Sequence, residues 1–164
     1  MKINTRKLTV VTVFASLYAV GVIFLAPISF SVFQVRVADA MLPLSMIFGI
    51  PGALGFSLGC IVSNVYGGLG IIDIVCGATA NLVACSLAWY MRGKGRVVQR
   101  FLGSITETVI VAAIVGGIDL PLVYHVPLAI SLLGVLVGEI IAINVLGFPI
   151  EEALRRSKIF KKYS

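Results

Sequence analysis

The stretch FQVRVADAMLPL, residues 33–44, separates two long apolar runs and decides how the chain can fold. Within six positions it places Gln34, Arg36 and Asp39, and an apolar run begins again directly after them. Charged side chains cost free energy inside a bilayer, and those found there usually face a bundle interior or a wet cavity. We therefore expect this stretch to join two membrane helices and to hold its charged groups at the mouth of a helix bundle.

The composition of the whole chain is that of an integral membrane protein. Of the 164 residues, 59% are hydrophobic and only 12% are charged, with a mean hydropathy of +1.08. A soluble domain carries about 25% charged residues. Because a membrane helix needs roughly 20 apolar residues, the length allows five or six spans. It leaves no room for a soluble catalytic or nucleotide-binding domain.

We predict a single all-α transmembrane domain, residues 1–164, built as a bundle of six helices. The helices are expected at about 8–26, 39–50, 52–66, 73–91, 101–118 and 127–148. Residues 28–37 are rich in Phe, Val and Ile and roughly alternate, which predicts a short extended segment between helices 1 and 2. The basic tail, residues 149–164, is amphipathic and is expected to lie along the cytoplasmic membrane surface.

The basic residues indicate the orientation of the bundle. Twelve of the thirteen fall into three blocks, at residues 2–7, 92–100 and 155–162. Cytoplasmic loops carry an excess of Lys and Arg. Six spans with the N-terminus inside place all three blocks in the cytoplasm, whereas five spans would put the two terminal blocks on opposite sides. We therefore predict a multi-pass protein of the cell membrane with both termini cytoplasmic.

In this topology the polar groups gather in the outer half of the membrane. Asp73, Gly77 and Asn81 recur every four residues, so they share one helix face. Glu139 lies in the middle of the last span. The candidate substrate-binding residues are Glu139, Asn81, Asp73, Arg36, Asp39, Asn64, Tyr66 and Tyr124, the two tyrosines as surfaces for stacking.

Purely structural interpretations stand beside the functional one. Asp39 and Asp73 each sit where a predicted helix starts, so either can be only an N-cap. Arg36 can pair with Asp39 or extend to the lipid headgroups. The two asparagines can be hydrogen-bond links between helices. Ser104 and Glu107 match a capping box. Glu139 is the hardest to explain in this way, because it is an ionisable group far from either predicted helix end.

Several function classes are disfavoured because their motifs are missing from the sequence. It holds no G-x-x-x-x-G-K-[ST] loop for ATP, no H-E-x-x-H, and no Cys/His cluster for a metal. The three cysteines stand singly in apolar runs and are expected to be small buried hydrophobes. We therefore predict no catalytic residue, no metal site and no cofactor in this chain.

Residues 33–84 resemble the signature region of the QueT-type proteins. The resemblance rests on VRVADAMLP at 35–43, GIPGALGFSLGC at 49–60, the turn NVYGGLG at 64–70 and GIIDIVCGATA at 70–80. The second half of the chain agrees in hydropathy and length, with weaker motifs. QueT-type proteins are substrate-binding S components of energy-coupling factor (ECF) transporters, associated with queuosine precursors.

The resemblance implies capture of a 7-deazaguanine base from outside. Delivery would follow by docking on a transmembrane T subunit that two ATPases drive with ATP. Ala15-x-x-x-Ala19 resembles the small-residue contact that such proteins make with the T subunit, although ordinary helix packing explains the same pattern.

The residues support this kind of ligand independently. A purine-like base offers ring and amine donors that carboxylates accept, and four carboxylates stand against one arginine at the predicted outer mouth. Three alternatives stay open. They are an S component for another vitamin-like ligand, a stand-alone proton-coupled carrier that uses Glu139 and Glu107, and a membrane enzyme or assembly protein.

Overall fold

The computed structural model describes residues 5–29, 36–68, 70–93 and 96–157, and every element in these ranges is a helix. The elements, in chain order, are α1 (Thr5–Phe24), α2 (Ala26–Ser29), η1 (Val37–Leu44), α3 (Ser45–Phe48), α4 (Ile50–Gly67), α5 (Ile71–Met91), α6 (Val97–Val111), η2 (Ala112–Asp119), α7 (Leu120–Tyr124), α8 (Leu128–Glu139), η3 (Ile140–Gly147) and α9 (Phe148–Arg156).

Five of the helical stretches are long and apolar enough to cross a bilayer. They are Thr5–Phe24, Ile50–Gly67, Ile71–Met91, Val97–Tyr124 and Leu128–Arg156. The last two are continuous through α6, η2 and α7 and through α8, η3 and α9. The prediction of an all-helical, multi-pass membrane protein is therefore confirmed.

The sixth predicted helix, at 39–50, is a shorter and more complex element. A 3₁₀ helix, η1, runs directly into the four-residue α3, and the chain then turns at Gly49, whose φ of 70° is the left-handed conformation that glycine adopts without strain. At about 2.0 Å per 3₁₀ residue and 1.5 Å per α residue, Val37–Phe48 rises roughly 22 Å. That is less than the roughly 30 Å hydrocarbon core.

This short element lies in the middle of the bundle rather than against lipid. Nine of its twelve residues are buried, including Asp39, Pro43 and Ser45. Irregular backbone at membrane depth is tolerated where protein encloses it, because lipid cannot satisfy its polar groups. The enclosure explains why the sequence pattern predicted a helix here but not its 3₁₀ form.

Further boundaries differ from the sequence prediction, among them those of the helix expected at 101–118, which runs from Val97 to Tyr124. Within the predicted extended segment, Ile28 and Ser29 belong to α2 and Val37 to η1, while residues 30–35 lie outside the described part of the chain. The predicted surface tail is helical up to Arg156 and continues the last span. Its Leu154 packs on the core, and Glu151 and Glu152 are buried against basic side chains of the bundle.

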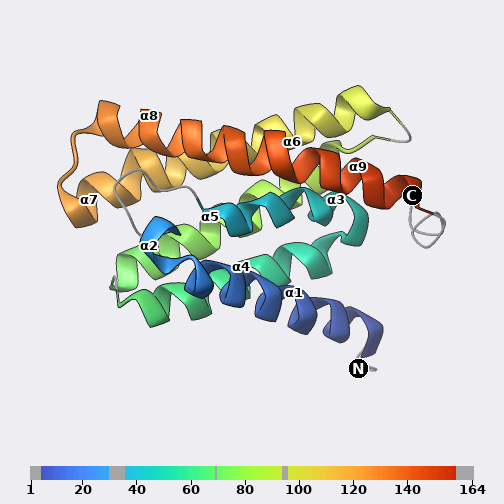
Figure 1. Ribbon diagram of the computed structural model, residues 1–164, viewed down its shortest axis with the longest axis horizontal. Coiled ribbons are helices and arrows are strands. Elements are labelled where there is room, and N and C mark those ends of the chain that lie inside the picture. Colours follow the sequence, from blue (N-terminus) through green and yellow to red (C-terminus); the bar gives the residue numbers. More distant parts are fainter. Residues whose placement is uncertain (1–4, 30–35, 69, 94–95, 158–164) are drawn as a thin grey trace.

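The helices pack in an order that follows the chain. Helix α1 lies along α4, α4 along α5, and α5 along α6, while the last span covers η1 and η2 (Figure 1). The α1–α4 contact is close because Gly55 and Gly59 carry no side chain. A Cβ built on Gly59 would lie 2.7 Å from the carbonyl oxygen of Ala15. Gly55 and Gly59 thus form a G-x-x-x-G motif, whose small residues let two helix backbones approach closely.

The start of α1 and the end of α9 lie at the same end of the bundle (Figure 1). We call this the basic end, because Lys7, Arg92, Arg100 and Arg155 gather there, and we call the opposite end the acidic end. The acidic end holds α7 and the turn between α4 and α5 (Figure 1). The polar residues proposed from the sequence lie between the acidic end and the middle of the bundle, as described below.

Candidate functional site

Seven polar side chains from five elements are buried together between the acidic end and the middle of the bundle. We call them the polar cluster; each is at most 3% exposed. They are Arg36 and Asp39 at η1, Asn64 on α4, Asp73 and Asn81 on α5, Asp119 on η2 and Glu139 on α8. Six of the seven belong to the set proposed from the sequence. Asp119 was not in that set.

Arg36 connects η1 to the first turn of α5. Its Nη2 lies 3.8 Å from Oδ1 of Asp73, and its Nη1 donates to Sγ of Cys60 at 3.6 Å. The separation from Asp73 is an ion pair but is too long for a hydrogen bond. Nε and Nη2 of Arg36 and both carboxylate oxygens of Asp73 have no hydrogen-bond partner. The expected partner, Asp39, is near enough for an electrostatic interaction, but the ion pair forms with Asp73.

Asp39 is held from the opposite side by a residue that sequence reasoning missed. The hydroxyl of Tyr18, which is fully buried on α1, donates to Oδ1 of Asp39 at 2.5 Å. The second oxygen of Asp39 has no partner, and the carboxyl of Glu139 lies within interaction range of it. A tyrosine within the apolar run 8–26 was the available signal, because a buried phenol usually needs a polar partner.

Asn64 and Asn81 form another side of the cluster. Nδ2 of Asn64 donates to the backbone oxygen of Asp73 at 3.1 Å, so this amide does link α4 to α5. Its Oδ1 has no partner, and neither does Nδ2 of Asn81. On α5, Gly77 lies between Asp73 and Asn81 on the same helix face. A Cβ there would come within 2.8 Å of Nδ2 of Asn64 and 2.9 Å of Sγ of Cys60.

Two π-helical segments lie beside the remaining carboxyls. Segment η2 ends at Asp119, and η3 begins directly after Glu139. A π turn takes more residues than an α turn and so rotates the following side chains around the helix axis, and such turns are frequent at functional sites. The close approach of η3 to η1 fixes the level of Glu139, since a Cβ on Gly147 would lie 2.5 Å from the backbone oxygen of Ala40.

The cluster contains more buried polar atoms without a hydrogen-bond partner than is usual in a protein interior. Buried polar side-chain atoms normally have at least one partner. Here all seven residues keep at least one buried side-chain atom without a hydrogen-bond partner, on groups that include four carboxyls. Within the described residues, no group of three or more His, Cys, Asp or Glu has an arrangement suited to a metal ion. The arrangement is suited to binding a polar organic molecule.

Residues 8–156, nearly the whole chain, match the sequence model of a protein family described as QueT transporter. The chain belongs to the QueT transporter family. No curated protein and no solved structure shows a significant similarity to it. Together with the five apolar spans, membership of this family makes the chain a membrane transport protein rather than an enzyme.

In this QueT-family chain the helix-cap interpretations of the acidic residues are wrong. Asp39 lies inside η1 and Asp73 inside the first turn of α5, whose N-cap is Gly70, and neither helix start has a side-chain cap. Helix α6 starts at Val97, so Glu107 lies within it and forms no capping box. One oxygen of Glu107 accepts a hydrogen bond from Ser45 at 3.1 Å, and the other has no partner.

Two proposed stacking residues lie at the margin of the cluster. Tyr66 is 66% exposed and is not enclosed with the buried groups. Tyr124 is 38% exposed at the end of α7, within electrostatic range of Asp73 and Asp119. Tyr124 is therefore placed at the rim of the acidic end.

The two alanines proposed for a partner contact lie on the α4 side of α1. Ala19 is 6% exposed, and the backbone of Ala15 touches the positions of Gly55 and Gly59. The face of α1 that stays exposed carries larger apolar side chains, among them Leu17 and Val20. Packing within the chain thus accounts for the alanine spacing.

Proposed function

We propose that this QueT-family protein is the substrate-binding S component of an ECF importer and captures a queuosine precursor, a 7-deazaguanine base. The observation that carries the proposal is the convergence of buried, unpartnered polar atoms from five elements in the polar cluster. Burying such atoms without partners costs roughly 1–3 kcal/mol each. A ligand that supplies the partners recovers that free energy on binding.

The chemistry of the cluster favours a cationic or donor-rich ligand. Four carboxyls, on Asp39, Asp73, Asp119 and Glu139, stand against the single guanidinium of Arg36. A deazaguanine presents ring N–H and amine donors to carboxylates and a carbonyl oxygen to an arginine or an amide. An aminomethyl substituent would add a cation for a second carboxylate. An anionic ligand would be repelled.

The proposed partners and orientation follow from the same assignment. The acidic end would face outward and receive the ligand, and the basic end with both termini would face the cytoplasm, as the distribution of Lys and Arg favours. Transport would need a T subunit and two ATPases, since the sequence holds no P-loop. Helix α1 suits a partner contact because it is the least buried of the five spans.

Calorimetry on the purified protein tests the proposal. A 7-deazaguanine that carries an aminomethyl group should bind in preference to guanine and to common vitamins. Glu139→Gln and Asn81→Ala should each weaken binding more than tenfold while the protein stays folded. Asn144→Ala is the matched control, because it removes an amide that bonds to Thr108 and Ser104 away from the cluster. Unchanged affinity in both cluster variants would refute the assignment of the site.

A second candidate, a stand-alone proton-coupled carrier, is favoured by one observation. Four buried carboxyls follow one another from the cluster toward the basic end. Glu139 is near Asp39, Asp39 near Glu107, and Glu107 near Glu151. Buried carboxyls in series are typical of proton relays. Uptake into vesicles by this chain alone, abolished by a protonophore and independent of ATP, would favour the carrier over the S component.

A further inference from the structure

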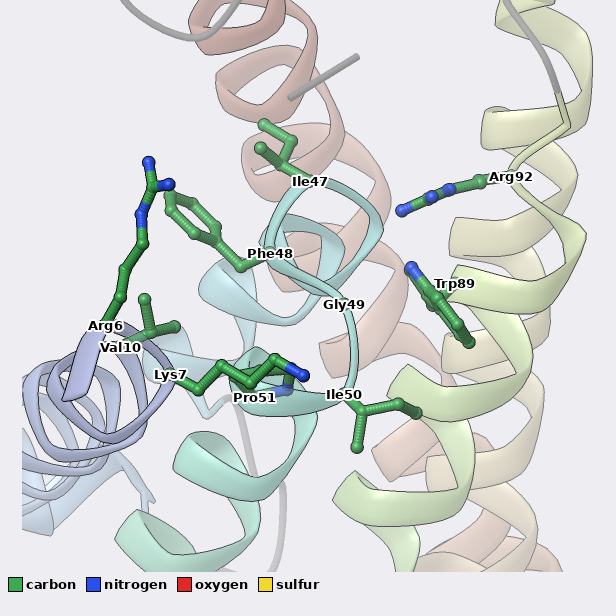
Figure 2. A pocket seen from close by; sticks show the side chains of 10 residues that line it. All are labelled: Arg6, Lys7, Val10, Ile47, Phe48, Gly49, Ile50, Pro51, Trp89 and Arg92. Atoms are coloured by element: carbon green, nitrogen blue, oxygen red, sulfur yellow. The ribbon is translucent and has the colours of Figure 1, made fainter. Parts of the chain in front are cut away.

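The basic end contains a cavity that the proposed function does not use. It has a volume of about 490 Å³ and is lined by Arg6, Lys7, Val10, Ile47, Phe48, Gly49, Ile50, Pro51, Trp89 and Arg92. Figure 2 shows Arg6 and Lys7 entering from α1 on one side and Trp89 and Arg92 from α5 on the other, with the α3–α4 turn between them. Three of its lining residues are basic and none is acidic.

Contacts with the protein hold one of these basic groups in place. Nη1 of Arg92 donates to the backbone oxygen of Met46 at 3.0 Å, and its guanidinium lies 5.1 Å from the centre of the Trp89 ring. Partial burial and the neighbouring charge of Arg155 lower the pKa of Arg92. The lining thus brings basic side chains together with no acidic residue among them, and an anion in the cavity would be attracted by them.

The turn that forms one wall is shaped to receive the tryptophan. Gly49 has a φ of 70°, and a Cβ on it would lie 3.1 Å from Nε1 of Trp89. The indole therefore lies directly against the glycine backbone. Its N–H is a hydrogen-bond donor, and tryptophan is enriched at the headgroup level of membranes, where one part of the ring is apolar and another is wet.

An apolar track leads away from the cavity along the outside of α4. Ile50 lines the cavity, and Leu54, Leu58 and Val62 follow it at the four-residue spacing of one helix face. These four side chains are 39–53% exposed. A molecule with an anionic head in the cavity and a hydrocarbon chain along this track would satisfy both surfaces.

We propose that this cavity binds the phosphate headgroup of an anionic phospholipid, with an acyl chain along Ile50, Leu54 and Leu58. Lys7 and Arg92 attract the phosphate, and Trp89 sets its depth at the membrane interface. Basic pockets between membrane helices bind anionic headgroups in this way. The same phosphate chemistry could come from free phosphate, but the apolar track favours the lipid.

The test uses Trp89 itself, which is the only tryptophan in the sequence. The full chain is reconstituted in phosphatidylcholine vesicles, and quenching of its fluorescence by lipids with brominated acyl chains is measured. Brominated phosphatidylglycerol should bind near Trp89 at least tenfold more strongly than brominated phosphatidylcholine. Equal quenching by the two lipids would overturn the proposal.

Charge variants show whether the cavity, rather than the general positive surface, attracts the lipid. Lys7→Gln should lower the preference for phosphatidylglycerol about fivefold, the effect expected for one basic group near a membrane surface. Arg92→Gln should lower this preference by a similar factor. If loss of the hydrogen bond to Met46 prevents the Arg92 variant from folding, Lys7→Gln alone provides the test. The control is Arg96→Gln, an exposed basic residue outside the cavity, which should keep the preference. An equal loss in Arg96→Gln and Lys7→Gln would overturn the proposal.

A third arm separates the two sources of phosphate. Inorganic phosphate at millimolar concentration should neither shift the emission of Trp89 nor protect it from brominated phosphatidylglycerol. Protection by inorganic phosphate would show that the cavity takes the free ion, and would refute a lipid site.

Discussion

Replacing Gly77 by alanine should separate ligand binding from folding. Gly77 lies on the face of α5 between Asp73 and Asn81, next to the unpartnered atoms of the polar cluster. A Cβ at this position would lie 2.8 Å from Nδ2 of Asn64, 2.9 Å from Sγ of Cys60 and 3.4 Å from Nη1 of Arg36. The methyl group would therefore occupy space beside three groups of the site.

The contact distances set the size of the effect. Ordinary contacts begin at 3.4 Å, so the amide of Asn64 must move by at least 0.6 Å. That movement stretches its 3.1 Å hydrogen bond to the backbone oxygen of Asp73. Sγ of Cys60 must also move, which disturbs the hydrogen bond that it accepts from the guanidinium of Arg36. Losing one neutral hydrogen bond and one charged hydrogen bond to a ligand costs roughly 2–4 kcal/mol. The dissociation constant should then rise by about 30-fold or more.

The fold should survive the same substitution. Alanine is better than glycine in a helix interior by about 1 kcal/mol, which offsets part of the roughly 1–3 kcal/mol that overpacking costs. The atoms in contact also belong to side chains rather than to backbone. We therefore expect a thermal midpoint within a few degrees of that of the wild type.

Calorimetric titration with an aminomethyl-7-deazaguanine, together with thermal unfolding in detergent, measures both quantities. The matched control is Gly117→Ala, because a Cβ on Gly117 meets no atom within 4 Å. Gly117→Ala should bind as the wild type does. Wild-type affinity in a stable Gly77→Ala protein would show that the ligand does not lie beside this face of α5.

Three further substitutions and one control test the contacts that hold the bundle and the site. Tyr18→Phe should weaken ligand binding about fivefold in calorimetry, because it leaves Oδ1 of the buried aspartate at η1 without its donor; unchanged binding would remove that aspartate from the site. Arg100→Gln should lower the free energy of unfolding by about 3 kcal/mol in denaturant titrations, since it removes the buried arginine that bonds to Glu152 at 2.5 Å and leaves only the distant, exposed Arg156 beside this carboxylate. The exposed Arg156→Gln should change it by less than about 0.5 kcal/mol, and equal effects would contradict the importance of burial. Gly59→Ala should lower the thermal midpoint, because its Cβ would lie 2.7 Å from backbone oxygen on α1, which cannot move aside as a side chain can; an unchanged midpoint would show that the α1–α4 contact is loose.

The long spans could be predicted from the sequence because hydropathy over about 20 residues is a local property. Predicted helices at 52–66 and 73–91 match α4 and α5 within two residues at each end. The element at Val37–Phe48 was predicted less well. It is apolar enough for a membrane helix, but its 3₁₀ geometry depends on enclosure by the other helices.

Most members of the polar cluster could also be predicted, because an ionisable or amide side chain in an apolar run usually faces the bundle interior or a wet cavity rather than lipid. Their partners could not. The pairing of Arg36 with Asp73, rather than with the nearby Asp39, depends on how η1 is rotated against α5. Whether Tyr18 faces Asp39 depends in the same way on how α1 is rotated about its own axis. Nothing in the sequence indicated the π turns beside Asp119 and Glu139.

The amino-acid sequence alone determined that this is a multi-pass membrane protein and where its long spans lie. It also determined which polar side chains lie within apolar segments, where burial costs free energy. These properties depend on the side chains within a single segment. Only the tertiary structure decided which polar groups meet, which of their atoms stay unpartnered and that a basic cavity forms around Trp89. The physical reason is that helix rotation and depth are fixed by contacts between distant segments, such as Gly59 against Ala15 and Gly147 against Ala40.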